Sequence, residues 1–227
     1  MKTILLIGAS SAVAKEVAKQ LKTEGQTIIS ISRSQPEAPF DIYHQHDVSS
    51  DDPMPIVDSC IDGLVYFPGT INLKPFQSLK APNFLEDFQI NVLGAIKSIQ
   101  SYSKNLALSE SASIILYSTV AVQMGMSFHA SVAASKGAIE GLTRSLAAEF
   151  APKIRVNCIA PSLTNTPMAS RLLSSPEKIE ASALRHPLKE IGDPKDLANM
   201  TVFLLSDTSK WMTGQILHLD GGISSIK

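Results

Sequence analysis

The sequence contains little cysteine, no long apolar run and no excess of charge of one sign. Its two cysteines, Cys60 and Cys158, match no metal-binding or redox spacing, so we expect reduced, buried thiols, as in a cytosolic protein. The 20 Lys and Arg and 21 Asp and Glu are scattered and leave a net charge of −1, which excludes the basic footprint of a protein that binds nucleic acid or an anionic membrane. No apolar run approaches the roughly 18 residues of a membrane span.

The first residues, MKTILLIGASSAVAKEV, combine a lysine, an apolar stretch and small residues, as a secretory signal does. The uninterrupted apolar stretch ILLI has only four residues, fewer than the roughly 7–15 of a signal peptide. A charged amphipathic segment follows at once. We therefore expect a buried first strand and a cytoplasmic protein.

With 44% apolar and 18% charged residues, the chain is able to bury a substantial core. No internal repeat, low-complexity tract or linker divides it, so residues 1–227 are expected to form a single domain. Short apolar runs predict strands at 3–8, 26–32, 42–48, 63–67, 112–118, 154–160 and 215–220. Segments with helical period predict helices at 12–22, about 83–107, about 131–150, 171–184 and 194–206.

This alternation of strands and helices predicts an α/β fold. Parallel strands need right-handed crossovers, so we expect one doubly wound, Rossmann-type domain with a central parallel sheet of about seven strands and helices on both faces. Ligands of such sheets bind beyond the carboxyl ends of the strands, where the strand order reverses.

The first strand ends in GASSAVA (8–14) and runs directly into a helix, which is the arrangement that binds a pyrophosphate. Of the three usual glycines only Gly8 is present, and Ala12 and Ala14 stand at the other two places. The predicted phosphate loop comprises Gly8, Ser10, Ser11, Ala12 and Val13. A strand-to-helix turn built of small residues, with no ligand, is the alternative interpretation.

The second strand ends at Ser32 and Arg33, where an acidic residue would bind the ribose of NAD. A guanidinium and a hydroxyl suit a 2′-phosphate instead, so we predict NADP(H) over NAD(H). A solvated surface arginine is the alternative. Asp47, beside Val48 after the third strand, is predicted to accept a hydrogen bond from the adenine amino group; an aspartate that caps a turn is the competing explanation.

With these elements in order, residues 3–223 resemble the short-chain dehydrogenase/reductase family, especially members similar to 3-oxoacyl-carrier-protein reductase. Besides GASSAVA, the resemblance depends on YFPG (66–69), INVLGA (90–95), IRVNCIAPSLTNTPM (154–168) and MTGQILHLDGG (212–222). It implies further cofactor contacts from Pro68, Gly69, Pro161, Thr164 and Thr166, the last beside the nicotinamide carboxamide.

The resemblance also implies hydride transfer between a nicotinamide and a carbonyl or alcohol carbon. In the family a tyrosine carries the proton, a lysine holds the ribose and lowers the pKa of that tyrosine, a hydroxyl orients the substrate and an asparagine supports a water. Asn91 and Lys136 match. The hydroxyl falls on Thr119, with Ser118 as second choice, but in SVAASKGAIEG (131–141) Val132 stands where the resemblance expects the tyrosine.

None of the four tyrosines lies within ten residues of Lys136, so a shifted alignment does not supply the missing phenol. The candidates for a replacement proton donor are His129, Tyr66, Tyr117 and a water held by Thr119. His129 lies three residues before Val132, but the sequence favours a loop histidine exposed to solvent over a proton donor in the cleft. Tyr117 is expected to point to the sheet face opposite Thr119, and Tyr66 to lie above the cofactor loop in a packing role.

Two functions follow. The first is an NADP(H)-dependent oxidoreductase for a small carbonyl or alcohol substrate, with altered or impaired proton donation. The second is a non-catalytic, nucleotide-binding relative that serves as a structural or regulatory subunit. A tyrosine replaced by engineering is a third explanation of Val132.

Three remaining patterns concern partners and access to the site. His44 and His46 share a strand face, but no carboxylate or cysteine completes a set, so we expect no metal. The small residues of 130–141 indicate a homodimer or homotetramer, as in the family, and the apolar C-terminal strand offers a second contact; packing within one chain is the alternative. Residues 162–190, with Met168, Leu172 and Leu173, predict a lid over an apolar cleft or else an ordinary surface helix.

Overall fold

The computed structural model describes residues 1–226, which build one seven-stranded parallel sheet in the order β3-β2-β1-β4-β5-β6-β7. The strands are β1 (Thr3–Ile7), β2 (Thr27–Ser32), β3 (Ile42–Gln45), β4 (Gly63–Tyr66), β5 (Ala112–Tyr117), β6 (Ile154–Pro161) and β7 (Ile216–Leu219). Each of them overlaps a predicted strand.

The chain begins in the middle of the sheet. Strand β1 pairs with β2 on one side and with β4 on the other. The strand order therefore reverses between β1 and β4, and the prediction of a doubly wound parallel sheet is confirmed.

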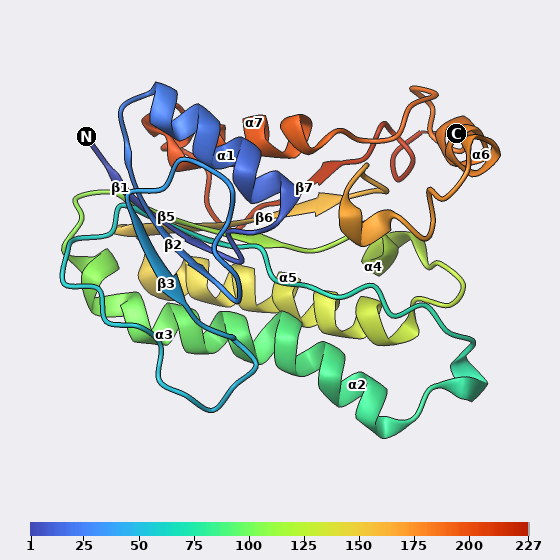
Figure 1. The fold of residues 1–227 in the computed structure, drawn as a ribbon, viewed down its shortest axis with the longest axis horizontal. Helices are drawn as coiled ribbons and strands as arrows, with labels where there is room; N and C mark the ends of the chain where they lie inside the picture. The colour runs from blue at the N-terminus through green and yellow to red at the C-terminus, as the bar shows by residue number, and fades with distance from the viewer. Residues whose placement is uncertain (227) are drawn as a thin grey trace.

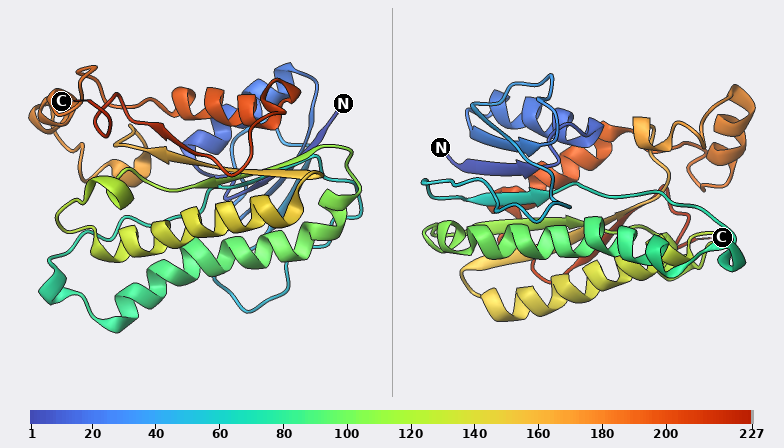
Figure 2. Two further views of the ribbon diagram at one scale, coloured as in Figure 1. Left: turned by 180° about the vertical axis from the view of Figure 1, so that it is seen from behind. Right: turned by 60° about the horizontal axis from the view of Figure 1, so that its bottom comes forward.

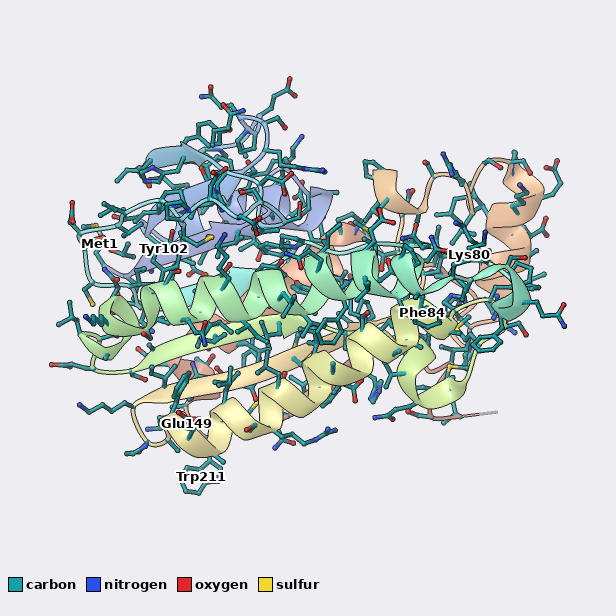
Figure 3. The ribbon with its side chains drawn as sticks, turned by 90° about the horizontal axis from the view of Figure 1, so that it is seen from below. Met1, Lys80, Phe84, Tyr102, Glu149 and Trp211 are labelled. Atoms are coloured by element: carbon teal, nitrogen blue, oxygen red, sulfur yellow. The ribbon has the colours of Figure 1, made fainter. Side chains whose placement is uncertain are left out.

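Helices cover both faces of the sheet (Figure 1). Helices α1 (Ala12–Thr23) and α7 (Pro194–Leu205) cover one face. The other is covered by α2 (Ala81–Phe88), the π-helical turn η2 (Gln89–Leu93), α3 (Gly94–Ala107) and α5 (Ala130–Phe150). Figure 3 shows α3 and α5 lying side by side under the sheet.

Alternation along each strand divides the core between the two faces. In β1, Ile4 and Leu6 pack against α1 and α7, whereas Leu5 and Ile7 pack on the side of α3 and α5. Both clusters are closed to solvent, so the strands of the sheet centre are apolar on both sides, as parallel sheets require.

The helix predictions differ from the structure in three places. The helix expected at 83–107 is one continuous segment, α2–η2–α3, that includes a π-helical turn. The helix expected at 171–184 begins only at Pro176, because the Ser175 side chain caps it and proline occupies the first turn; it is α6 (Pro176–Leu184). The short α4 (Ala121–Met124) was not predicted, since four residues show no period. Three 3₁₀ turns complete the list: η1 (Phe76–Ser78), η3 (Pro167–Ala169) and η4 (Asp207–Ser209).

The segment between β6 and α7 lies beyond the carboxyl ends of the strands. In Figure 2 the segment 162–192, which includes α6, lies at the end of the molecule opposite the N-terminus.

The prediction of buried, reduced thiols holds in part: Cys158 is buried, but Cys60 is only half-buried, and both are free. Within residues 1–226 no helix combines the length and apolar character that a bilayer crossing requires.

Candidate active site

A cleft of about 1110 Å³ opens at the carboxyl end of the sheet, where the strand order reverses. The loops after β1 to β6, the start of α5 and the segment 162–186 form its walls. It is lined by every predicted cofactor residue, namely Gly8, Ser10, Ser11, Ala12, Val13, Ser32, Arg33, Asp47, Val48, Pro68, Gly69, Lys136, Pro161, Thr164 and Thr166. The candidates Ser118, Thr119, His129 and Val132 line it as well.

The turn between β1 and α1 requires its single glycine. Gly8 has φ +78°, and a Cβ there would lie 2.8 Å from Cδ of Pro68, so only glycine fits. Ser11 then caps α1, its Oγ accepting from the Ala14 amide at 3.1 Å. The amides of Ala12 and Val13 have no acceptor within residues 1–226 and belong to residues that line the cleft, so they are available to an anion.

The two alanines at the usual glycine places differ in their surroundings. Ala14 is fully buried between the helix and the sheet. Ala12 lines the cleft, so only its methyl group reduces the space for a ligand.

At the end of β2, Ser32 and Arg33 have unequal freedom. The Ser32 hydroxyl is buried and donates to the Ser34 carbonyl oxygen at 2.7 Å. Its proton is therefore not available to a 2′-phosphate, contrary to the prediction. The exposed Arg33 guanidinium has no hydrogen-bond or salt-bridge partner in the part of the chain that the structure describes. Arg33 therefore remains the cation of this end of the cleft.

Asp47 caps the turn after β3, which is the alternative that the sequence offered to a contact with adenine. Its Oδ1 accepts from the Ser49 amide at 2.9 Å and the Ser49 hydroxyl at 2.6 Å, and these bonds lower the pKa of Asp47. No donor to Oδ2 is found among residues 1–226, so a role toward adenine remains a prediction.

Lys136 is held on the inner wall of the cleft by α5. The side chain is 7% exposed, and Nζ donates to the Tyr117 carbonyl oxygen at 2.9 Å. Burial lowers the pKa of Lys136 to about 8, against the opposing influence of Cys158 and Asp87. Val132, one helical turn earlier on the same face, is buried and also lines the cleft.

Asn91 lies behind the cleft wall rather than on it. It occupies the π-helical turn η2, a rare conformation that recurs at functional sites, and is fully buried. Its Nδ2 donates to Thr70 Oγ1 at 2.9 Å and to the Asp87 carbonyl oxygen at 2.7 Å. The buried Asn91 Oδ1 has no donor within residues 1–226.

Asn91 and Lys136 approach each other at Gly69. A Cβ on Gly69 would lie 3.2 Å from Asn91 Oδ1 and 3.3 Å from Lys136 Nζ. Any side chain at this position would therefore crowd both groups. The structure thus brings together two residues that are 45 positions apart in the sequence, as the family resemblance implied.

A buried carboxylate that the sequence did not reveal supports this arrangement. Asp87 accepts hydrogen bonds from Thr70 Oγ1 at 2.6 Å, Asn72 Nδ2 at 2.7 Å and Ser131 Oγ at 2.5 Å. It thereby ties the loop after β4 to α2 and α5. Its three donors come from separate segments, so no local motif signals it.

The two candidate hydroxyls differ in what they bind. Thr119 Oγ1 accepts from the Ala121 amide at 3.3 Å, and no acceptor for its proton lies within residues 1–226. The buried Ser118 hydroxyl donates to Glu140 Oε1 at 2.8 Å. Thr119 is therefore the hydroxyl that a substrate in the cleft can use.

The tyrosines and His129 are engaged elsewhere. The Tyr117 hydroxyl lies 2.5 Å from Thr201 Oγ1 of α7, which confirms that it points away from Thr119. Tyr66 is buried against η2 and donates to the Ile90 carbonyl oxygen at 2.5 Å, so its expected place above the cofactor loop is wrong. His129 stands at the N-terminus of α5, with Nδ1 2.8 Å from the Ser127 carbonyl oxygen.

The outer part of the cleft contains residues that sequence reasoning missed. His186 is buried, with Nε2 2.8 Å from Ser162 Oγ and Nδ1 2.9 Å from the Ser182 carbonyl oxygen. Of the predicted lid residues, Met168 and Leu172 line the cleft and Leu173 does not. Further apolar lining comes from Ile71, Leu73, Met124, Met126, Phe128 and Leu163.

The fold and the cleft together define a doubly wound nucleotide-binding protein whose ligand site lies at the reversal of strand order. A family model described as enoyl-(acyl carrier protein) reductase matches residues 56–224. The chain is 27% identical to L-xylulose reductase of Bos taurus, over 96% of this chain and 94% of that protein. It is 29% identical to 3-oxoacyl-[acyl-carrier-protein] reductase FabG of Thermotoga maritima, over 98% and 97% of the two chains.

A solved structure, ligand-free aldohexose dehydrogenase of Thermoplasma acidophilum, superposes with a TM-score of 0.89 at 25% identity, covering 98% of this chain and 94% of that one. The protein belongs to the short-chain dehydrogenase/reductase family. The family binds nicotinamide cofactors, and the relatives named here are oxidoreductases.

Proposed function

We propose that this protein is an NADP(H)-dependent oxidoreductase that interconverts a carbonyl and an alcohol group of a small molecule. The observation that carries the proposal is one cleft lined by the first amides of α1, by Arg33 and by Lys136 with Thr119. Within residues 1–226 those amides and the Arg33 guanidinium have no hydrogen-bond partner. A chain that did not hold a nicotinamide nucleotide would have no evident need for a cation buried at the end of that cleft.

The residues present fit the phosphorylated cofactor. The α1 amides of Ala12 and Val13 are available to its pyrophosphate, Arg33 to the 2′-phosphate, and Lys136 to ribose hydroxyls. Thr164 and Thr166 line the end of the cleft beside β6, where the carboxamide would bind. When bound, the cofactor supplies or accepts the hydride.

The chain's own groups orient the substrate. Thr119 offers a hydroxyl proton to the substrate oxygen, and Asn91 with the Asp87 cluster fixes the wall behind Lys136. The apolar residues of the outer cleft, among them Met126, Phe128 and Met168, exclude water and favour an apolar substrate.

The proposal includes assembly as a homodimer or homotetramer in the cytoplasm. Small residues on α5 support it, because a Cβ on Gly141 would meet nothing within 4 Å and another backbone is able to approach there. The half-buried strand β7 at the sheet edge offers a second surface.

One observation favours the alternative, a non-catalytic nucleotide-binding subunit. Val132, which has no exchangeable proton, lines the cleft one turn before Lys136. If no other group gives a proton, the cleft binds the nucleotide without turnover.

Cofactor titration tests the proposal. NADPH should bind more tightly than NADH, and Arg33→Ala should weaken NADPH binding about tenfold or more while leaving NADH nearly unchanged. Arg171→Ala, an exposed arginine that does not line the cleft, is the matched control and should change neither. Equal effects of Arg33→Ala on the two cofactors would remove the NADP(H) assignment.

Turnover separates the two functions. Reduction of carbonyl compounds by the wild-type protein supports the oxidoreductase. Binding without reduction, with reduction restored by Val132→Tyr, supports the non-catalytic alternative. Absence of binding by both cofactors would reject the proposed function.

A further inference from the structure

The inner end of the cleft contains few groups that are able to give a proton to a bound substrate. Thr119 has one, but a threonine hydroxyl at its ordinary, very high pKa is a hydrogen-bond donor and not an acid near neutral pH. Ser118 donates to Glu140, and Tyr117 directs its hydroxyl to Thr201 on the far face of the sheet. Burial raises the pKa of Tyr117 further above its usual range.

Three histidines line the cleft. His46 follows β3 at the edge of the sheet, and β2, β1 and β4 separate it from β5, whose last residue Tyr117 accepts the hydrogen bond of Lys136. The other two histidines already have hydrogen-bond partners. His129 stands before the first turn of α5, with Nδ1 directed at the Ser127 carbonyl oxygen. His186 has partners on both ring nitrogens, Ser162 on Nε2 and Ser182 on Nδ1. Neither has the position on the inner wall that Lys136 has.

Lys136 has donors to spare. Its ammonium group carries three protons, and in residues 1–226 the single acceptor within hydrogen-bond distance is the Tyr117 carbonyl oxygen. Among residues 1–226, no carboxylate forms a salt bridge with Lys136. Val132, one helical turn before Lys136 on the same helix, has an apolar side chain and so accepts no hydrogen bond from the ammonium group.

We propose that Lys136 is itself the acid of the reaction, giving the proton that the substrate oxygen takes up during reduction. This inference rests on the proposed function and assigns the step that Val132 cannot perform.

The step balances as follows in the direction of reduction. A C–H bond forms at the carbonyl carbon with the hydride of the reduced cofactor, and the π electrons of the C=O bond move to oxygen. One N–H bond of Lys136 breaks and its proton bonds that oxygen, directly or over one water. The carbonyl compound is reduced to the alcohol, the cofactor is oxidised, and the neutral amine of Lys136 regains a proton from solvent.

The charges around Lys136 suit this role. The groups that influence it are Asp87 of α2 and Cys158 of β6, while Glu140 of its own helix is bonded to Ser118. Burial outweighs the opposing influence of Cys158 and Asp87 and lowers the pKa of Lys136 to about 8, so the ammonium form prevails at neutral pH yet gives up its proton readily. An acid is most effective when its pKa lies near the working pH.

The first test uses the protein without cofactor. Acetylation of lysines by trace acetic anhydride, followed by mass spectrometry at a series of pH values, reports when each amine loses its proton. Lys136 should become reactive through about pH 8, well below the ordinary lysine value of about 10.4. The exposed Lys153 serves as internal reference for reagent decay. A midpoint above pH 10 for Lys136 would overturn the assignment.

The second test restores the acid from outside. Lys136→Ala should lower the rate of methyl ketone reduction by about 10²–10⁴-fold, measured at NADPH concentrations that saturate the variant. Methylamine and ethylamine should restore part of the rate, and the restored rate should vary with the pKa of the added amine. Tetramethylammonium, which has a charge and no proton, should restore nothing. Equal rescue by tetramethylammonium would mean that only the charge matters.

Lys136→Arg is the matched variant, because it keeps the cation but its pKa above about 12 prevents proton release. It should bind NADPH, reduce ketones as poorly as Lys136→Ala and lose the fall in rate above pH 8. A wild-type protein that reduces ketones, with a Lys136→Arg variant that reduces them equally well, would overturn the role of Lys136 and leave the proposed function standing. Absence of NADPH binding would instead overturn the proposed function.

Discussion

The two ends of the sheet each contain a buried cation, and the two differ in how they are satisfied. Arg155 is the second residue of β6, at the amino end of the sheet, and Lys136 lies at the carboxyl end beside the cleft; both are 7% exposed. Arg155 reaches the carbonyl oxygens of Leu204 at 2.8 Å and Ser206 at 3.3 Å, and Ser209 Oγ at 3.0 Å. Lys136 reaches one carbonyl oxygen.

The number of acceptors separates a structural cation from a functional one. The Arg155 fork binds the carbonyl groups that the end of α7 leaves unpaired, which stabilises the closed end of the fold. Lys136 keeps free donors and a buried charge, which costs stability and is useful only to a ligand. The same degree of burial therefore has opposite meanings at the two ends of the sheet.

The largest effect should come from Arg155→Met. It removes the hydrogen bonds of a charged donor to the carbonyl oxygens of Leu204 and Ser206 and to Ser209 Oγ. Hydrogen bonds of a charged group contribute about 1.5–3 kcal/mol each, so we expect a loss of about 4 kcal/mol in the free energy of unfolding, measured by urea denaturation. Arg155→Lys should recover only part of the loss, because one ammonium group cannot reach the same set of oxygens. An unchanged stability would show that Arg155 is as unsatisfied as Lys136.

Lys136→Met should raise the free energy of unfolding, whereas Arg155→Met lowers it. The pKa of Lys136 is lowered from 10.5 to about 8, a difference of 2.5 units that corresponds to about 3 kcal/mol at most. Below pH 8 the folded protein bears the full cost of the buried charge, and the cost disappears as the pH rises from about 8 past 10.5. The variant should therefore exceed the wild type in stability by up to about 3 kcal/mol at pH 7.

The difference between variant and wild type should shrink steadily toward pH 10.5, as measured by urea denaturation at matched pH values. A Lys136→Met variant that is less stable than the wild type at pH 7 would mean that Lys136 stabilises the fold, as Arg155 does.

The elements of the fold could be predicted from the sequence because each strand and long helix has a local pattern. The apolar runs at 3–8 and 112–118 correspond to β1 and β5. Helix α6 began later than predicted because its start depends on the Ser175 cap and not on the apolar period. The four-residue helix α4 has no period to detect.

For the site, residues close to strand ends were predicted well and contacts between distant segments were not. The loop around Gly8 and the position of Lys136 follow from short motifs at strand and helix ends. The Asp87 cluster joins residues 70–72, 87 and 131, and the pair of Ser162 and His186 spans 24 positions. Tyr66 was misplaced because the core covers both faces of β4, so the apolar pattern does not show to which face its side chain points.

Ser11→Ala tests the free amides at the carboxyl end. Removal of the cap of α1 should cost about 1 kcal/mol and weaken NADPH binding, since the first turn of α1 lines the cleft. Ser175→Ala, the matched change at the cap of α6, should cost less, because α6 buries no residue and its cap bond is longer, at 3.4 Å. Thermal unfolding with and without NADPH compares the two variants.

The smallest effect should follow Asp207→Asn at the amino end. Asp207 pairs with Lys2 at 2.6 Å on the surface, where an ion pair contributes about 0–1 kcal/mol, and its charge also favours the cation of Arg155. If carbonyl oxygens satisfy Arg155, the variant should lose no more than about 0.5 kcal/mol in urea denaturation, and the loss should vanish in high salt. A loss comparable to that of Arg155→Met would mean that Arg155 depends on a carboxylate. Arg155 and Lys136 would then differ in whether a carboxylate pairs with the cation, and not in the number of hydrogen-bond acceptors around it.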